Sequence, residues 1–147
     1  MMRESVSHDL LDRSFEDLEV GMTASYDITI SHEDIREFSS ITGDLAPVHF
    51  DPDFAASMGY RKPVAFGLLV FARFSGLLGM VLPGPRSVIH ASSFSMKKPV
   101  YAEDRLTYIV EITRVVKSVK VVFLSLKVLR DKDDLVLQGE TRCGFVR

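Results

Sequence analysis

The stretch that decides the fold is Val64-Ala65-Phe66-Gly67-Leu68-Leu69-Val70-Phe71-Ala72-Arg73-Phe74-Ser75-Gly76-Leu77-Leu78-Gly79-Met80-Val81-Leu82. It is nineteen residues long and carries a single charge, Arg73. A helix that is apolar nearly all round is usually one buried in a core. The run is about long enough to span a membrane, but a charge at the bilayer centre costs several kcal/mol. We therefore expect a buried central helix that begins near Phe66 and ends before Pro83, and no membrane partner.

Upstream of the central run lies Thr42-Gly43-Asp44-Leu45-Ala46-Pro47-Val48-His49-Phe50, which places an acid and a histidine five residues apart. This loop cannot form a regular helix, because proline lacks a donor N–H and pushes Ala46 toward an extended backbone. Two interpretations stay open from the residues alone. Asp44 is a turn residue and His49 a partly buried neighbour, which is the commoner case, or the two side chains are aimed at one point for proton transfer.

Short helices are predicted on both sides of this loop. Ser31 with Asp34 three residues later is a variant of the capping box, and it predicts a helix over about residues 32–40. Asp51 followed by Pro52 is typical of a helix start, and Gly59 is placed to end that second helix.

The hydrophobic period changes to two after the central run, which indicates strands. Strands are expected over residues 23–30, 87–96, 105–116, 119–130 and 135–146. Short turns join the last three into an antiparallel meander. The predicted class is α+β, a strongly curved antiparallel sheet of about five strands wrapped round the central helix. Strands such as 119–130 are apolar on both faces, so we expect a homodimer or higher homo-oligomer that extends or covers the sheet.

Composition bounds the remaining possibilities. The chain has 147 residues, 46% of them hydrophobic, which predicts a loose N-terminal arm over 1–14 and one domain over 15–147. The net charge is −2, which argues against a nucleic-acid partner because phosphate binding needs a basic face. Cys143 is the single cysteine; we interpret it as a packing residue in a protein of a reducing, cytoplasmic compartment.

The loop and the central run together resemble the hot-dog fold, in particular the MaoC-like dehydratases and (R)-specific enoyl-CoA hydratases. The resemblance covers nearly the whole chain after about Phe15. Its specific part is Thr42-Gly43-Asp44, then Pro47-Val48-His49-Phe50-Asp51-Pro52 and Phe54-Ala55. A second similar stretch is Phe74-Ser75-Gly76-Leu77-Leu78-Gly79, followed by Leu82-Pro83-Gly84.

The resemblance implies a role for individual residues. Asp44 matches the catalytic aspartate and His49 the catalytic histidine of the family. Gly67 matches the glycine whose backbone N–H receives the thioester carbonyl, as an oxyanion hole. Ser75 matches a serine that lines the substrate site, although a serine in an apolar helix often bonds the carbonyl four residues back. Leu68 is expected to flank the acyl chain of the substrate.

Two positions depart from the family pattern. The family usually has asparagine before the loop proline, where this chain has Ala46, and histidine before the helix glycine, where it has Phe66. The first change removes a side chain that helps to hold the loop and the polar groups of the substrate. The second replaces a polar wall of the substrate pocket with an apolar one.

The chemistry of hydration fits these residue types. A histidine exchanges protons with water near neutral pH, a nearby aspartate can hold the same water and relay the second proton, and a backbone N–H can stabilise the enolate oxygen. The expected function is reversible hydration of a 2-enoyl thioester to an (R)-3-hydroxyacyl thioester. A hot-dog acyl-CoA thioesterase and a catalytically weakened thioester-binding subunit are the alternatives.

No cofactor or metal is expected. Coenzyme A or an acyl carrier enters only as part of the substrate, so the expected small partner is an acyl-CoA or acyl-carrier thioester. The histidines and acids lack the spacing of a zinc site, and there is no cysteine pair. The glycines form no phosphate-cradling loop.

Overall fold

The computed structural model describes residues 9–146, which form one antiparallel sheet with helices against it. The strand order is β1-β3-β4-β5-β2, and every neighbouring pair is antiparallel. The strands are β1 (Thr23–Thr29), β2 (Ser87–Met96), β3 (Arg105–Val116), β4 (Val121–Arg130) and β5 (Asp134–Phe145). The helices are η1 (Phe15–Asp17), α1 (His32–Thr42), η2 (Pro47–His49), α2 (Pro52–Ser57), α3 (Gly67–Ala72) and α4 (Phe74–Met80).

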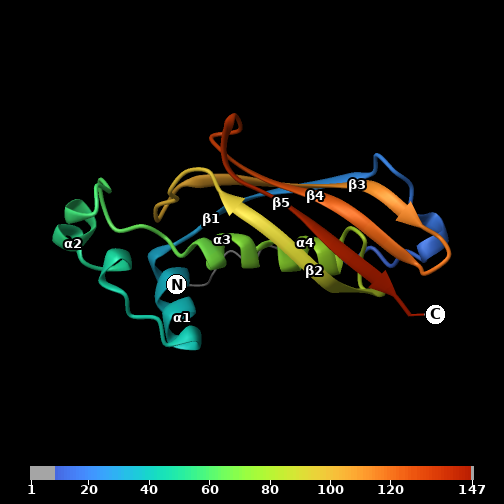
Figure 1. Cartoon of the computed structure of the whole chain (residues 1–147), viewed down its shortest axis with the longest axis horizontal. Coiled ribbons are helices and arrows are strands. Elements are labelled where there is room, and N and C mark those ends of the chain that lie inside the picture. The colour runs from blue at the N-terminus through green and yellow to red at the C-terminus, as the bar shows by residue number, and fades with distance from the viewer. Residues whose placement is uncertain (1–8, 147) are drawn as a thin grey trace.

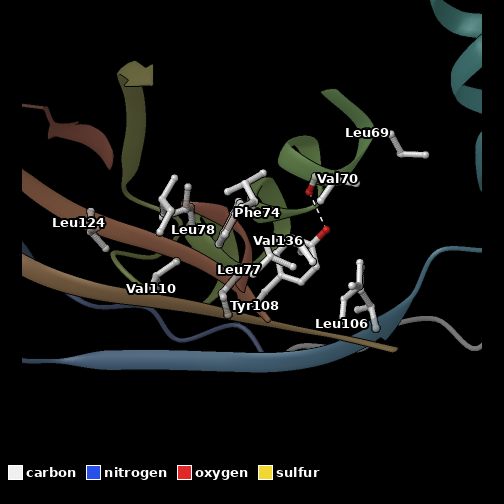
Figure 2. Packing of buried hydrophobic residues seen from close by; sticks show 14 of the residues in the cluster. Leu69, Val70, Phe74, Leu77, Leu78, Leu106, Tyr108, Val110, Leu124 and Val136 are labelled. Carbon is white, nitrogen blue, oxygen red and sulfur yellow. Dashed lines mark hydrogen bonds between the residues drawn. The ribbon is translucent and has the colours of Figure 1, made fainter. Parts of the chain in front are cut away.

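The helices α3 and α4 follow one another along one face of the sheet, whereas α1, η2 and α2 lie beyond its end (Figure 1). The predicted curved sheet round a central helical segment is therefore confirmed. The core forms where alternate residues of the meander face α3 and α4 (Figure 2). In β3 these are Leu106, Tyr108, Val110 and Ile112, each at most 1% exposed.

The central helix differs from the single helix that the apolar run predicts, because it is divided at Arg73. Two tyrosines from the sheet bond backbone carbonyls next to this division. The hydroxyl of Tyr108 donates to the carbonyl of Val70 at 2.6 Å, and that of Tyr26 donates to the carbonyl of Arg73. The two rings stack at 5.2 Å, so the sheet fixes the helices by polar contacts as well as by packing. No helix of residues 9–146 is long and apolar enough to cross a membrane.

Removing the Tyr108 hydroxyl tests how much this contact contributes. Tyr108→Phe is expected to lower the free energy of unfolding by about 1–3 kcal/mol, because the carbonyl of Val70 then loses its buried donor. Tyr101→Phe is the matched control, since its ring keeps the Arg61 guanidinium 4.1 Å from its centroid. Urea unfolding of both variants measures the difference, and equal losses would show that the Tyr108 bond contributes nothing.

Strand β2 forms one edge of the sheet, and most of its side chains are exposed. His90 of this strand lies outside the core. A bulge between Ile89 and Ala91 shifts the register, and His90 is exposed with its ring over Gly144. A Cβ atom at Gly144 would come within 2.0 Å of that ring, so a side chain at this position would require the His90 ring to move.

The expected N-terminal arm is described from residue 9 onward; residues 1–8 lie outside the described part. Here the arm is attached to the end of α4. The N–H of Leu11 donates to the carbonyl of Met80 at 2.9 Å, Arg13 donates to the carbonyl of Val81, and Asp12 pairs with Arg86 at 2.6 Å. These contacts keep residues 11–13 against the domain.

Candidate active site

The loop after α1 begins with the geometry that its glycine permits. Gly43 caps the helix with φ +73°, and its N–H donates to the carbonyl of Ser39 at 2.8 Å. The Asp44 carboxylate then accepts the N–H of Ala46 at 2.9 Å, which forms an Asx turn. Pro47 starts the short helix η2, which ends at His49. The backbone thus presents the histidine on a rigid turn.

The imidazole of His49 is held on one edge and on one face. Its Nδ1 lies 2.8 Å from the carbonyl oxygen of Val64. Since a carbonyl can only accept, Nδ1 carries a proton in this contact, and Nε2 is left to act as a base. The ring lies against that of Phe66, with centroids 3.8 Å apart.

His49 and Gly67 line the same cavity, which has a volume of about 390 Å³. The walls come from η2, the turn after α2, the start of α3 and the end of β2, and include Met58, Tyr60 and Met96. A Cβ atom at Gly67 would lie 3.3 Å from Cγ of Met96, so a side chain there would narrow the cavity. As the first residue of α3, Gly67 has a backbone N–H with no acceptor inside the helix.

The other predicted site residues lie outside this cavity. Asp44 is exposed, and its carboxylate caps its own turn. Ser75 and Leu68 lie on exposed positions of α4 and α3, with Leu68 62% exposed. Within residues 9–146 the Ser75 hydroxyl makes no hydrogen bond, so the expected alternative of a bond to the preceding turn is not seen. The single chain therefore brings His49, Gly67 and Phe66 together, but not Asp44 or Ser75.

Ser39 is a supporting residue that the sequence interpretation missed. Its side chain is buried, 3% exposed, and its hydroxyl donates to the backbone carbonyl of Asp44 at 2.6 Å. It stands four residues after Ile35, on the same buried face of α1. The feature of the sequence that could have indicated this role is a serine on an otherwise apolar helix face.

Positively charged residues line part of the cavity, since Lys97 and Lys98 are among its lining residues. Lys98 pairs with Asp134, and Arg130 pairs with the same carboxylate at 2.9 Å. The hydrogen bonds from Lys98 and then Arg130 hold the pKa of Asp134 below its usual value. Lys97 is exposed and has no such acidic partner among the described residues.

Metal binding and nucleophilic attack by a thiol are two other kinds of chemistry that a site could support. Residues 9–146 contain no cluster of three or more histidine, cysteine or acidic side chains that could hold a metal ion. Burial raises the pKa of the Cys143 thiol to about 11, so this residue is a poor nucleophile at neutral pH, as a packing residue should be.

A curved antiparallel sheet round a central helical segment, with an acid–histidine loop at its end, defines a hot-dog protein of the dehydratase class. The family model described as "MaoC like domain" matches residues 16–130. The chain belongs to the MaoC-like domain family.

Similar proteins agree with this assignment. An (R)-specific enoyl-CoA hydratase of Aeromonas caviae is 33% identical over 127 residues, which are 86% of this chain and 95% of that protein. A 3-hydroxybutyryl-CoA dehydratase of Methylorubrum extorquens is 34% identical over 86% of this chain and 80% of its own. The solved structure of the (R)-hydratase from A. caviae involved in PHA biosynthesis superposes with a TM-score of 0.84 at 31% identity, covering 89% of this chain and 99% of that one.

Proposed function

We propose that this protein is a hydro-lyase that reversibly hydrates a 2-enoyl thioester, on coenzyme A or an acyl carrier, to the (R)-3-hydroxyacyl thioester. The observation that carries the proposal is that His49 and Gly67 line one cavity, the first as a potential base and the second as a backbone donor. The names of the similar proteins support the same reaction.

The mechanism follows from these groups. Nε2 of His49 takes a proton from a water molecule as the oxygen attacks the β-carbon of the enoyl group. The Gly67 N–H stabilises the enolate oxygen, a contribution that is typically about 2.7–4 kcal/mol for one such donor. Asp44 holds the same water and relays to the α-carbon a proton that solvent supplies, while the proton on His49 is released to solvent, so that one water molecule is added across the double bond. Both protons come from side chains and water, so we propose that the reaction needs no cofactor.

We further propose that two copies assemble through β2. This edge strand has exposed apolar side chains, including Val88 at 62% and Ile89 at 47%. The adjoining helices leave Leu68 62% exposed and Ser75 exposed. Pairing of two β2 strands would remove a long open edge and cover these helix positions, which is also where Ser75 would meet a substrate site.

An edge variant tests the assembly. Ile89→Lys is expected to shift the protein from dimer to monomer, because a charge would be buried at the centre of the interface. Val20→Lys is the control, since Val20 is 63% exposed and lies outside β2. Sedimentation velocity over a range of concentrations measures the change, and a monomeric wild type would contradict the proposal.

Two further observations bear on the cellular location and on the carrier of the substrate. A free, buried Cys143 agrees with a reducing compartment, and we propose the cytoplasm. Lys97, which lines the cavity, is suited to a phosphate of the substrate carrier.

The activity is tested by incubating the full chain with crotonyl-CoA and following loss of the conjugated double bond, with the product resolved by chirality. Formation of (R)-3-hydroxybutyryl-CoA without free thiol is the expected result. Release of free thiol would instead identify a thioesterase. If the wild type is inactive on coenzyme A and carrier substrates of several lengths, while Ala46→Asn with Phe66→His is active, the protein is a weakened binding subunit.

A further inference from the structure

We infer that Phe66 is a positioning residue for His49. Its ring holds the imidazole in the one orientation that keeps Nδ1 on the carbonyl of Val64 and leaves Nε2 free for proton transfer. The geometric part of this inference stands by itself, and its kinetic part rests on the proposed hydration.

The hydrogen bond alone does not fix the imidazole. A single contact between Nδ1 and the Val64 oxygen, at 2.8 Å, lets the ring pivot about the line that joins the two atoms. The ring of Phe66 blocks that movement, because its centroid lies 3.8 Å from the imidazole centroid at an interplanar angle of 32°. One edge contact and one face contact together define the position of Nε2.

Phe66 is itself held firmly enough to serve as a support. It is 4% exposed, and its ring centroid lies 5.0 Å from that of Phe38 and 6.1 Å from that of Phe50. A side chain packed on several sides occupies one rotamer, whereas a ring on an open surface would exchange between several.

Phe66 also affects the backbone conformation at Gly67, the second group in the site. Phe66 is the N-cap of α3, with φ −64° and ψ 127°, and Gly67 follows it as the first helical residue. The ring of Phe66 therefore ties the direction of the Gly67 N–H to the position of the His49 ring. A base and a backbone donor that must act on one bound substrate are aligned through one side chain.

An apolar ring is suited to this position for a chemical reason. The phenyl ring of Phe66 carries no N–H, O–H, nitrogen or oxygen, so it cannot compete with the Val64 carbonyl for Nδ1 of His49. The departure from the family's usual histidine at residue 66 thus leaves the backbone carbonyl as the partner that selects the tautomer.

The experiment compares Phe66→Leu, which removes the ring, with Phe66→His, which keeps a planar ring. Phe15→Leu is the matched control: Phe15 is buried, with one aromatic partner at 5.5 Å, and lies in η1 away from the cavity. The readouts are kcat and KM with crotonyl-CoA, and the imidazole nitrogen NMR signals of His49, assigned by their loss in His49→Asn.

Phe66→Leu is expected to lower kcat about tenfold to a hundredfold with KM little changed, because a small misplacement of a reacting group has an effect of this size. Its His49 signals should change from one Nδ1-protonated tautomer to an average of two. Phe66→His keeps a planar ring but adds nitrogens that can compete with Val64 for Nδ1, so it should lose less kcat than Phe66→Leu. Phe15→Leu should lose stability without losing kcat.

Unchanged His49 signals in Phe66→Leu would overturn the inference. So would an equal loss of kcat in Phe15→Leu, because the effect would then be one of general stability. If Phe66→Leu does not fold, unchanged tautomer signals in Phe66→Met, which fills more of the same space without a ring, or a full loss of kcat in Phe66→His, would overturn it. An inactive wild type contradicts the proposed function, while the NMR comparison still tests the contact.

Discussion

His49→Asn is expected to lower kcat for hydration of crotonyl-CoA by about 10²–10⁴-fold, the usual contribution of a positioned general base. Asparagine places an amide nitrogen near the position of Nδ1, so it can still donate to the carbonyl of Val64. It has no counterpart of Nε2 that can accept a proton. The variant therefore removes the base and keeps the local hydrogen bond, and initial rates over a range of substrate concentrations separate kcat from KM.

His32→Asn controls for the loss of a histidine elsewhere. His32 is exposed at the first position of α1 and contacts no part of the cavity. Its kcat and thermal midpoint should equal those of the wild type. If His49→Asn kept the wild-type rate, His49 would be only a neighbour in a turn, as the residues of the loop alone allow.

Much of the fold could be predicted because its signals are local. The capping pair Ser31 and Asp34 forms both reciprocal bonds, and the predicted helix start at Pro52 is confirmed. Alternation along residues 105–116 predicted the extent of β3. Strand β4 begins two residues later than expected, at Val121, because residues 117–120 form a wider turn with Lys120 at φ +51°.

Features that depend on distant partners could not be predicted. The division at Arg73 coincides with hydroxyl groups from β1 and β3, far away in the sequence. The exposure of His90 depends on a bulge and on the space above Gly144 in the next strand. In each case the tertiary fold brings a group from a distant part of the sequence close to the residue concerned. An apolar run or an alternating pattern gives no information about such a group.

The candidate site likewise contains residues that the sequence predicted and supporting groups that it did not. The resemblance led to His49 and Gly67, and the structure places them in one cavity. The carbonyl that selects the tautomer belongs to Val64, and the hydroxyl that holds the loop belongs to Ser39. Backbone acceptors and buried serines have no motif, so these supports are visible only in three dimensions.

Asp44→Asn is expected to lower kcat by a similar factor, about 10²–10⁴, because the amide cannot supply a proton to the α-carbon. The turn should survive, since the asparagine side-chain oxygen can still accept the N–H of Ala46, and the bond from Ser39 goes to the backbone of residue 44. Asp53→Asn is the control, because Asp53 is exposed in the first turn of α2. Circular dichroism checks the fold, and the same hydration assay measures kcat.

The combination of the two substitutions decides whether Asp44 and His49 act together. Asp44 is exposed in the single chain and does not line the cavity with His49, so its role depends on both groups reaching one water molecule. Groups that act as a unit are strongly non-additive, and the double variant should then be about as slow as the slower single variant. If the two losses multiply, the side chains act on separate steps. If Asp44→Asn alone keeps the wild-type rate, Asp44 serves only its Asx turn, and the second proton comes from another donor at the site.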